Sequence, residues 1–79
     1  MRLVQILGPG CPKCEQLKKN VEQAIQTTGV EAIVEKVSDI NQIISFGVMM
    51  TPGLVIDGEV KAVGKVLSAD EVSQLLRAS

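Results

Sequence analysis

This sequence contains no histidine, tryptophan or tyrosine, and Phe46 is its only aromatic residue. Without imidazole, acid–base catalysis by histidine is excluded, and any metal site has to be built from other ligands. Without large aromatic rings, a hydrophobic core has to be assembled from valine, isoleucine and leucine, and the hydrophobic fraction of 46% is sufficient for that. The chemistry of this chain therefore rests on a small set of residue types.

Excess charge and long apolar runs are also missing. The formal net charge is −1, which gives no reason to expect nucleic acid or an anionic membrane as a partner. The apolar runs are too short to span a bilayer. The first residues, Met1 to Gln5, lack the apolar region of a secretory signal. These features predict one domain over residues 1–79, monomeric and cytoplasmic.

The only two cysteines stand in the tetrapeptide Cys11-Pro12-Lys13-Cys14. In a cytosolic chain, such a close pair is more often catalytic or metal-binding than structural. The pair follows a branched apolar run, Leu3 to Leu7, that Gly8-Pro9-Gly10 interrupts, and helical periodicity comes after it. We therefore expect Cys11 at the start of a helix, where unpaired backbone N–H groups and the helix dipole favour a thiolate. The charge of Lys13 would favour it further.

A helix is predicted from Pro12 to Gly29. Pro12 suits the first turn because the N–H that it lacks has no partner there, and Gly29 suits the C-terminal stop. Apolar or small residues recur at spacings of three and four along one face: Cys14, Leu17, Val21, Ala24, Ile25 and Thr28. Because Cys14 begins this inward-facing stripe, we expect it to be the more buried of the two cysteines.

The second half of the chain predicts a strand over residues 30–37, and then a short helix capped by Asp39 and ended by Gly47. The buried face of that helix is expected to consist of Ile40, Ile43 and Ile44. Asp57-Gly58 between two apolar runs predicts a hairpin with a type I′ turn. Ser68 and Glu71 form a capping box that starts a last helix.

The element order is therefore β-α-β-α-β-β-α, which predicts an α/β fold with a four-stranded mixed sheet and helices on both faces. With this order, the chain resembles the smallest, glutaredoxin-sized thioredoxin-fold proteins, in particular the short prokaryotic redox-active disulfide proteins. The resemblance is carried by Cys11 to Cys14 after the first strand, by Thr51-Pro52 before the third strand, and by Asp57-Gly58 with Gly64 after it.

This resemblance implies a thiol-disulfide oxidoreductase that reduces protein disulfides. Cys11 would attack the client disulfide, and Cys14 would resolve the mixed disulfide. Thr51 and a cis-Pro52 would orient the substrate, together with Pro12 and Lys13. No cofactor is implied. The implied partners are disulfide-containing client proteins and a flavin-dependent reductase of the thioredoxin-reductase type.

Two further points are open at the level of sequence. Gln5 stands where larger thioredoxins have a buried aspartate, and strand alternation allows its side chain to point toward the cysteine pair. The alternative function is a metal or metalloid carrier that uses the same two thiols. Small copper carriers share the Cys-x-x-Cys spacing, but they end on a strand, whereas this chain ends on a capped helix. A structural zinc site would need four ligands.

Overall fold

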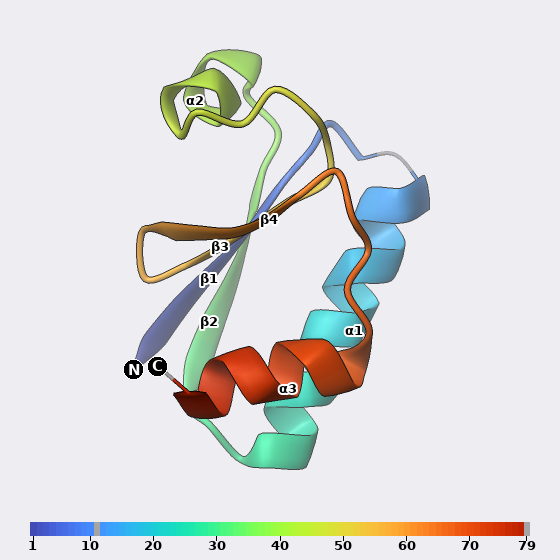
Figure 1. Ribbon diagram of the computed structural model, residues 1–79, viewed down its shortest axis with the longest axis vertical. Coiled ribbons are helices and arrows are strands. Elements are labelled where there is room, and N and C mark those ends of the chain that lie inside the picture. Colours follow the sequence, from blue (N-terminus) through green and yellow to red (C-terminus); the bar gives the residue numbers. More distant parts are fainter. Residues whose placement is uncertain (11, 79) are drawn as a thin grey trace.

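The computed structural model describes residues 1–10 and 12–78, and Cys11 and Ser79 lie outside the described residues. The described part forms four strands and three helices (Figure 1). In chain order they are β1 (Arg2–Leu7), α1 (Pro12–Thr28), β2 (Ala32–Val37), α2 (Ile40–Ser45), β3 (Gly53–Ile56), β4 (Glu59–Val63) and α3 (Ala69–Ala78). This order is the one that the sequence predicted.

The strands form a mixed sheet in the order β2-β1-β3-β4. β1 runs parallel to β2 and antiparallel to β3, and β3 pairs with β4 as an antiparallel hairpin. The register of the hairpin shifts between Leu54 and Val55. The predicted α/β class with a four-stranded mixed sheet is confirmed.

One face of the sheet is covered by α1 and α3, which lie on the same side of it in Figure 1. Because strand residues alternate between faces, Val4 and Ile6 of β1 point to this side, and the stripe predicted for α1 packs on them. Asn20 of α1 donates a hydrogen bond to the carbonyl oxygen of Leu67 at 2.9 Å, which ties the segment before α3 to α1. The resulting core consists of Val4, Ile6, Leu17, Val21, Ala24, Leu54, Ile56, Val72 and Leu76.

The other face is covered only in part, by the six-residue helix α2. Asp39 caps this helix and accepts hydrogen bonds from the N–H groups of Asn41 and Gln42. The expectation that three isoleucines of α2 are buried is wrong for two of them. Ile43 is buried, but Ile40 and Ile44 are 63% and 56% exposed. The physical reason is that a helix of six residues has fewer than two turns, and of its residues only Ile43 is buried.

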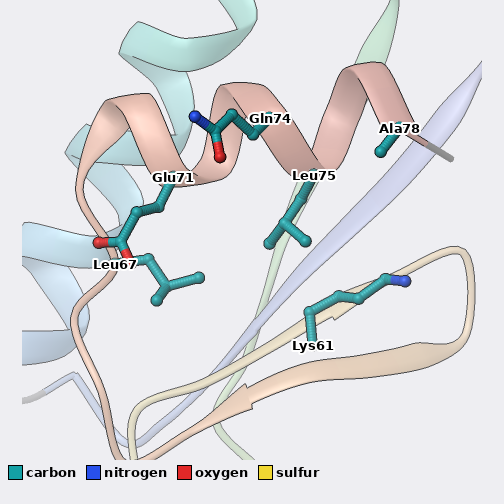
Figure 2. Close-up of a pocket in the computed structure, with 6 residues that line it drawn as sticks. All are labelled: Lys61, Leu67, Glu71, Gln74, Leu75 and Ala78. Carbon is teal, nitrogen blue, oxygen red and sulfur yellow. The ribbon is translucent and has the colours of Figure 1, made fainter.

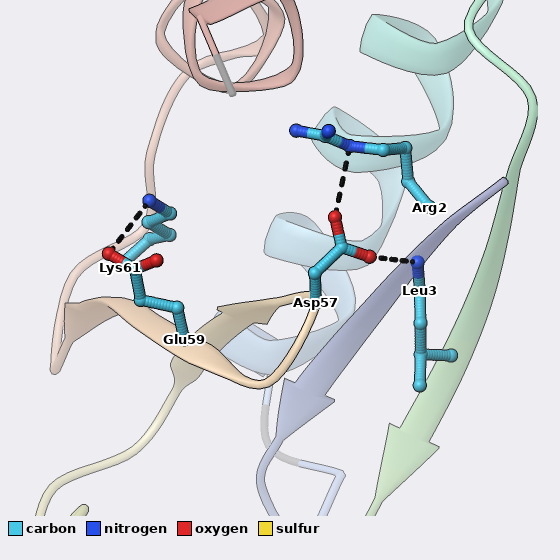
Figure 3. A network of polar contacts seen from close by, with 5 residues as sticks. All are labelled: Arg2, Leu3, Asp57, Glu59 and Lys61. Carbon is cyan, nitrogen blue, oxygen red and sulfur yellow. Dashed lines mark hydrogen bonds and ion pairs between the residues drawn. The ribbon is translucent and has the colours of Figure 1, made fainter.

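The hairpin turn has the conformation that its sequence predicted. Asp57 and Gly58 both have positive φ, 52° and 82°. The carboxylate of Asp57 also accepts a hydrogen bond from the N–H of Leu3 at 2.9 Å and lies 3.2 Å from Nε of Arg2, which fastens the turn to the beginning of β1 (Figure 3). On β4, Lys61 pairs with Glu59 at 3.2 Å. These contacts lie at the end of the sheet away from the cysteine motif.

The capping box of α3 is also formed as predicted. Ser68 donates its backbone N–H to the carboxylate of Glu71 at 3.0 Å, and Glu71 donates its own N–H to the hydroxyl of Ser68 at 3.2 Å. These hydrogen bonds lower the pKa of Glu71. Of the helices described, none is long and apolar enough to cross a membrane.

Candidate active site

Strand pairing brings two separate loops together at one edge of the sheet. The last residue of β1, Leu7, pairs with the first residue of β3, Gly53. The segment that leaves β1 therefore lies beside the segment that enters β3, and Figure 1 shows the loop before β3 passing the end of β1. In the chain, the first of these segments leads into the cysteine motif, and Thr51-Pro52 lies in the second. The register thus brings Thr51 and Pro52 close to the loop that leads from β1 to α1.

Cys14 lies in the first turn of α1 and is 1% exposed. Its thiol packs so closely against Gly8 that a methyl group on Gly8 would overlap its sulfur atom. The same methyl group would lie 3.7 Å from Cβ of Thr51. Glycine is needed at position 8 because the thiol occupies the space of a side chain. The expectation that Cys14 faces inward agrees with this burial, whereas Cys11, the expected nucleophile, lies outside the described residues.

The Thr51-Pro52 peptide bond is cis in the structure. Pro52 is fully buried and Thr51 is exposed, so the loop presents Thr51 to solvent at the edge where Cys14 lies beneath the surface. The carbonyl oxygen of Pro52 accepts a hydrogen bond from the N–H of Gly64 at 2.8 Å, which attaches the loop to the end of β4. Two strands therefore hold this loop in place.

A positive charge near the candidate site comes from Lys36, a residue that the sequence pattern did not indicate. Lys36, near the end of β2, places its ammonium 2.6 Å from the carboxylate of Glu15 in the first turn of α1. A hydrogen bond from Lys36, and then its charge, lower the pKa of Glu15. The predicted cation, Lys13, is exposed on α1, as is Pro12. The signal for Lys36 was its place at the carboxyl end of a strand parallel to β1, because such ends share one edge of the sheet.

An apolar pocket of about 240 Å³ opens next to the site. It lies between α2, the loop after β1 and the loop before β3. The residues that line it are Pro9, Ile40, Ile43, Ile44, Val48, Met49 and Thr51. The two exposed isoleucines of α2 and Met49, which is 88% exposed, thus form one apolar surface beside Thr51. From the sequence, Met49 is expected to be a loop or core filler, with an exposed, adaptable apolar contact as the alternative.

A second pocket, of about 410 Å³, is larger but lies elsewhere (Figure 2). It lies between α3 and the hairpin, and its lining residues are Lys61, Leu67, Glu71, Gln74, Leu75 and Ala78. It is lined by no cysteine among the described residues and by neither of the two loops that form the site. Size alone therefore does not mark the functional region, and the smaller pocket is the one next to the thiol.

A sheet of this order, a buried thiol in the first turn of the first helix and a proline loop packed beside it define the thioredoxin fold. Comparison with known proteins agrees. Residues 2–77 match the family model described as thioredoxin domain. A thioredoxin of Methanothermobacter thermautotrophicus is 40% identical over 76 residues, which cover 96% of this chain and 99% of the relative.

A thioredoxin of Methanocaldococcus jannaschii is 38% identical over 77 residues, which cover 98% of this chain and 88% of the relative. The chain belongs to the thioredoxin family. Membership makes it a protein thiol-disulfide oxidoreductase, a class whose partners are client proteins with disulfides and a thioredoxin reductase.

Proposed function

We propose that this chain reduces client disulfides through a cycle in which Cys11 attacks and Cys14 resolves. The Cys11 thiolate attacks one sulfur of the client disulfide, and the other client sulfur leaves as a thiolate. Cys14 then loses its proton and attacks the sulfur of Cys11, and the second client thiolate leaves. Two electrons pass from the dithiol to the client, and a Cys11–Cys14 disulfide remains. A flavin-dependent reductase returns the two electrons.

The observation that carries this proposal is the burial of Cys14 against Gly8 beside Thr51. A thiol that is 1% exposed is poorly placed to meet a disulfide on another protein, yet it stands only three residues after Cys11 in the chain. Those are the properties of a resolving cysteine. The attacking role then falls to Cys11, which directly precedes the first residue of α1 in the chain.

The exposed loop before β3 supports a way of orienting the client. Thr51 is exposed while Pro52 beside it is buried and held by the N–H of Gly64. A rigid exposed backbone of this kind can pair with an extended client segment as a short piece of strand. In this proposal an apolar client side chain enters the neighbouring pocket, where it contacts Ile44 and Met49. Pro12 and Lys13, both exposed, border the client on the other side.

The test is reduction of insulin disulfides by the full chain with dithiothreitol as the source of electrons. Turnover should exceed that of dithiothreitol alone, and both Cys11→Ser and Cys14→Ser should abolish the excess. A redox titration in defined thiol buffers should show one two-electron transition. The proposal is wrong if the purified protein is inactive and instead holds one equivalent of a thiophilic metal, as a metal carrier would.

A further inference from the structure

Residues 8–10 lead from β1 into the cysteine motif, and we call them the cysteine loop. Lys36 reaches the end of this loop because of the register of the sheet. It pairs with Ile6 of β1, whose side chain faces α1, so the side chain of Lys36 also projects toward the side of α1. β1 and β2 are parallel and end at the same edge, which places Lys36 beside the first turn of the helix. Its ammonium lies 2.6 Å from Oε1 of Glu15, and a methyl group on Gly10 would lie 3.6 Å from it.

Gly10 is the residue that directly precedes Cys11 in the chain. The ammonium of Lys36 therefore lies near the backbone of the cysteine loop, and it forms an ion pair with the carboxylate of Glu15. Lys36 acts on the first turn of α1, because its hydrogen bond and then its charge are the two largest causes of the lowered pKa of Glu15. Lys18 and Lys19 make smaller ones. Lys13 is exposed, and among the described residues its side chain is not within 4 Å of a methyl group placed on Gly10.

The other charged groups near these elements are directed elsewhere. On β2, Glu35 accepts a hydrogen bond from Gln5 at 3.0 Å, on the face of the sheet away from α1. At the start of α2, Asp39 accepts hydrogen bonds from the backbone of that helix. The charged residues on the first two turns of α1 and at the end of β2 are thus Lys13, Glu15, Lys18, Lys19 and Lys36. Among the described residues, the ammonium of Lys36 is the charged group that lies beside Gly10.

We infer that Lys36 and Glu15 together set the ionisation of the Cys11 thiol, with Lys36 stabilising the thiolate and Glu15 opposing it. This inference rests on the proposed role of Cys11 as the attacking thiolate. Lys36 is a positioning residue for charge, because it acts on the substrate only through Cys11. The ammonium is the part of the pair that would lie 3.6 Å from a methyl group on Gly10, so the net effect of the intact pair favours the thiolate.

This arrangement predicts opposite effects for its two members. Loss of Lys36 leaves the carboxylate of Glu15 without its counter-charge, and the pKa of Cys11 should rise. Loss of Glu15 leaves the ammonium uncompensated, and the pKa of Cys11 should fall. Both side chains are partly exposed, at 38% and 48%, so water and salt weaken the effect. We expect changes of about half a pH unit in dilute buffer.

The experiment is the rate of alkylation of Cys11 by iodoacetamide as a function of pH, followed by mass spectrometry of the peptide that contains Cys11. Lys36→Met should raise the pKa, and slow alkylation about threefold below it, since half a pH unit is about a threefold change in thiolate. Glu15→Gln should lower the pKa. Lys36→Arg, which keeps the charge, should restore the wild-type profile. All changes should shrink in 1 M KCl.

Lys19→Met is the matched control, because it removes the same charge from an exposed position further along α1. The inference is overturned if Lys36→Met and Lys19→Met have the same profile, or if Glu15→Gln raises the pKa as Lys36→Met does. The second outcome would mean that the pair merely shapes the loop. Failure of the proposed function is a separate result, because it would appear as no insulin reduction by the wild type whatever the alkylation profiles of the variants.

Discussion

The two faces of the sheet are built very differently. On the face under α1 and α3, Val4, Ile6 and Leu54 are at most 1% exposed, and two helices of 17 and 10 residues cover them. On the other face, the cover among the described residues is the six-residue α2 with Phe46 and Val48 after it, and Ile33 and Ile44 are 53% and 56% exposed. Stability is therefore concentrated on the first face. The second leaves apolar side chains accessible, and those of α2 border the site.

The largest expected effect is on the free energy of unfolding. Leu17→Ala, in the core under α1, should lower it by about 2–5 kcal/mol because the side chain is fully buried. Ile44→Ala, on α2, should change it by less than about 0.5 kcal/mol because the side chain is mostly exposed. Urea denaturation of both variants measures the contrast. Equal losses would show that the α2 face contributes as much to stability as the α1 face.

Gly8→Ala should disturb the packing of the loop after β1 against Cys14 in the first turn of α1. The added methyl group overlaps the sulfur of Cys14, so we expect a loss of about 1–3 kcal/mol and slower resolution of the mixed disulfide. Cys14→Ala in the same chain removes that sulfur and should recover most of the lost stability. A double-mutant cycle measures this coupling. Additive losses would contradict the close packing of Gly8 against Cys14.

Ile44→Gln should weaken client binding without affecting the core. Ile44 lines the pocket beside Thr51, so we expect the KM for an apolar disulfide peptide to rise roughly threefold to tenfold with little change in kcat. Ile33→Gln is the matched control, since Ile33 is almost equally exposed but pairs with Leu3 at the far end of β2. Peptide reduction kinetics decide the matter, and an equal rise in KM for both variants would remove the pocket from the proposal.

The smallest effect concerns the capping box of α3. The Ser68 hydrogen bonds lower the pKa of Glu71, so its carboxylate stabilises the fold above the unfolded pKa of about 4.3, and this stabilisation is lost as pH falls through the lower pKa of the folded state. The stability difference between wild type and Glu71→Gln should therefore be present at neutral pH and disappear in acid. Denaturation midpoints measured from pH 7 to pH 3 test this, and a difference that grows in acid would reverse the sign.

Local patterns in the sequence predicted the elements that depend on local physics. The Asp57-Gly58 turn, the Ser68–Glu71 capping box and the buried stripe of α1 all follow from near neighbours in the chain. The exposure of Ile40 and Ile44 could not be read in this way, because helical spacing identifies an apolar face but does not show whether a partner covers it.

The sequence pattern also could not predict the direction of side chains where that direction depends on strand register. Gln5 was allowed by alternation to point toward the cysteines, but its amide donates to Glu35 on the face of the sheet opposite α1. No sequence motif marks Lys36, although its register with Ile6 directs it toward α1 and the cysteine loop. In both cases the contacts of the side chain depend on the pairing register of β1 and β2, and no short sequence motif specifies that register.

The division of labour between the two cysteines is the central claim, and trapping of mixed disulfides tests it most directly. Each single variant, Cys11→Ser and Cys14→Ser, is reduced, mixed with a disulfide-containing client protein and analysed by mass spectrometry without reductant. The burial of Cys14 predicts that Cys14→Ser accumulates a stable mixed disulfide through Cys11, whereas Cys11→Ser forms almost none. Equal trapping by the two variants, or trapping by Cys11→Ser alone, would contradict the account.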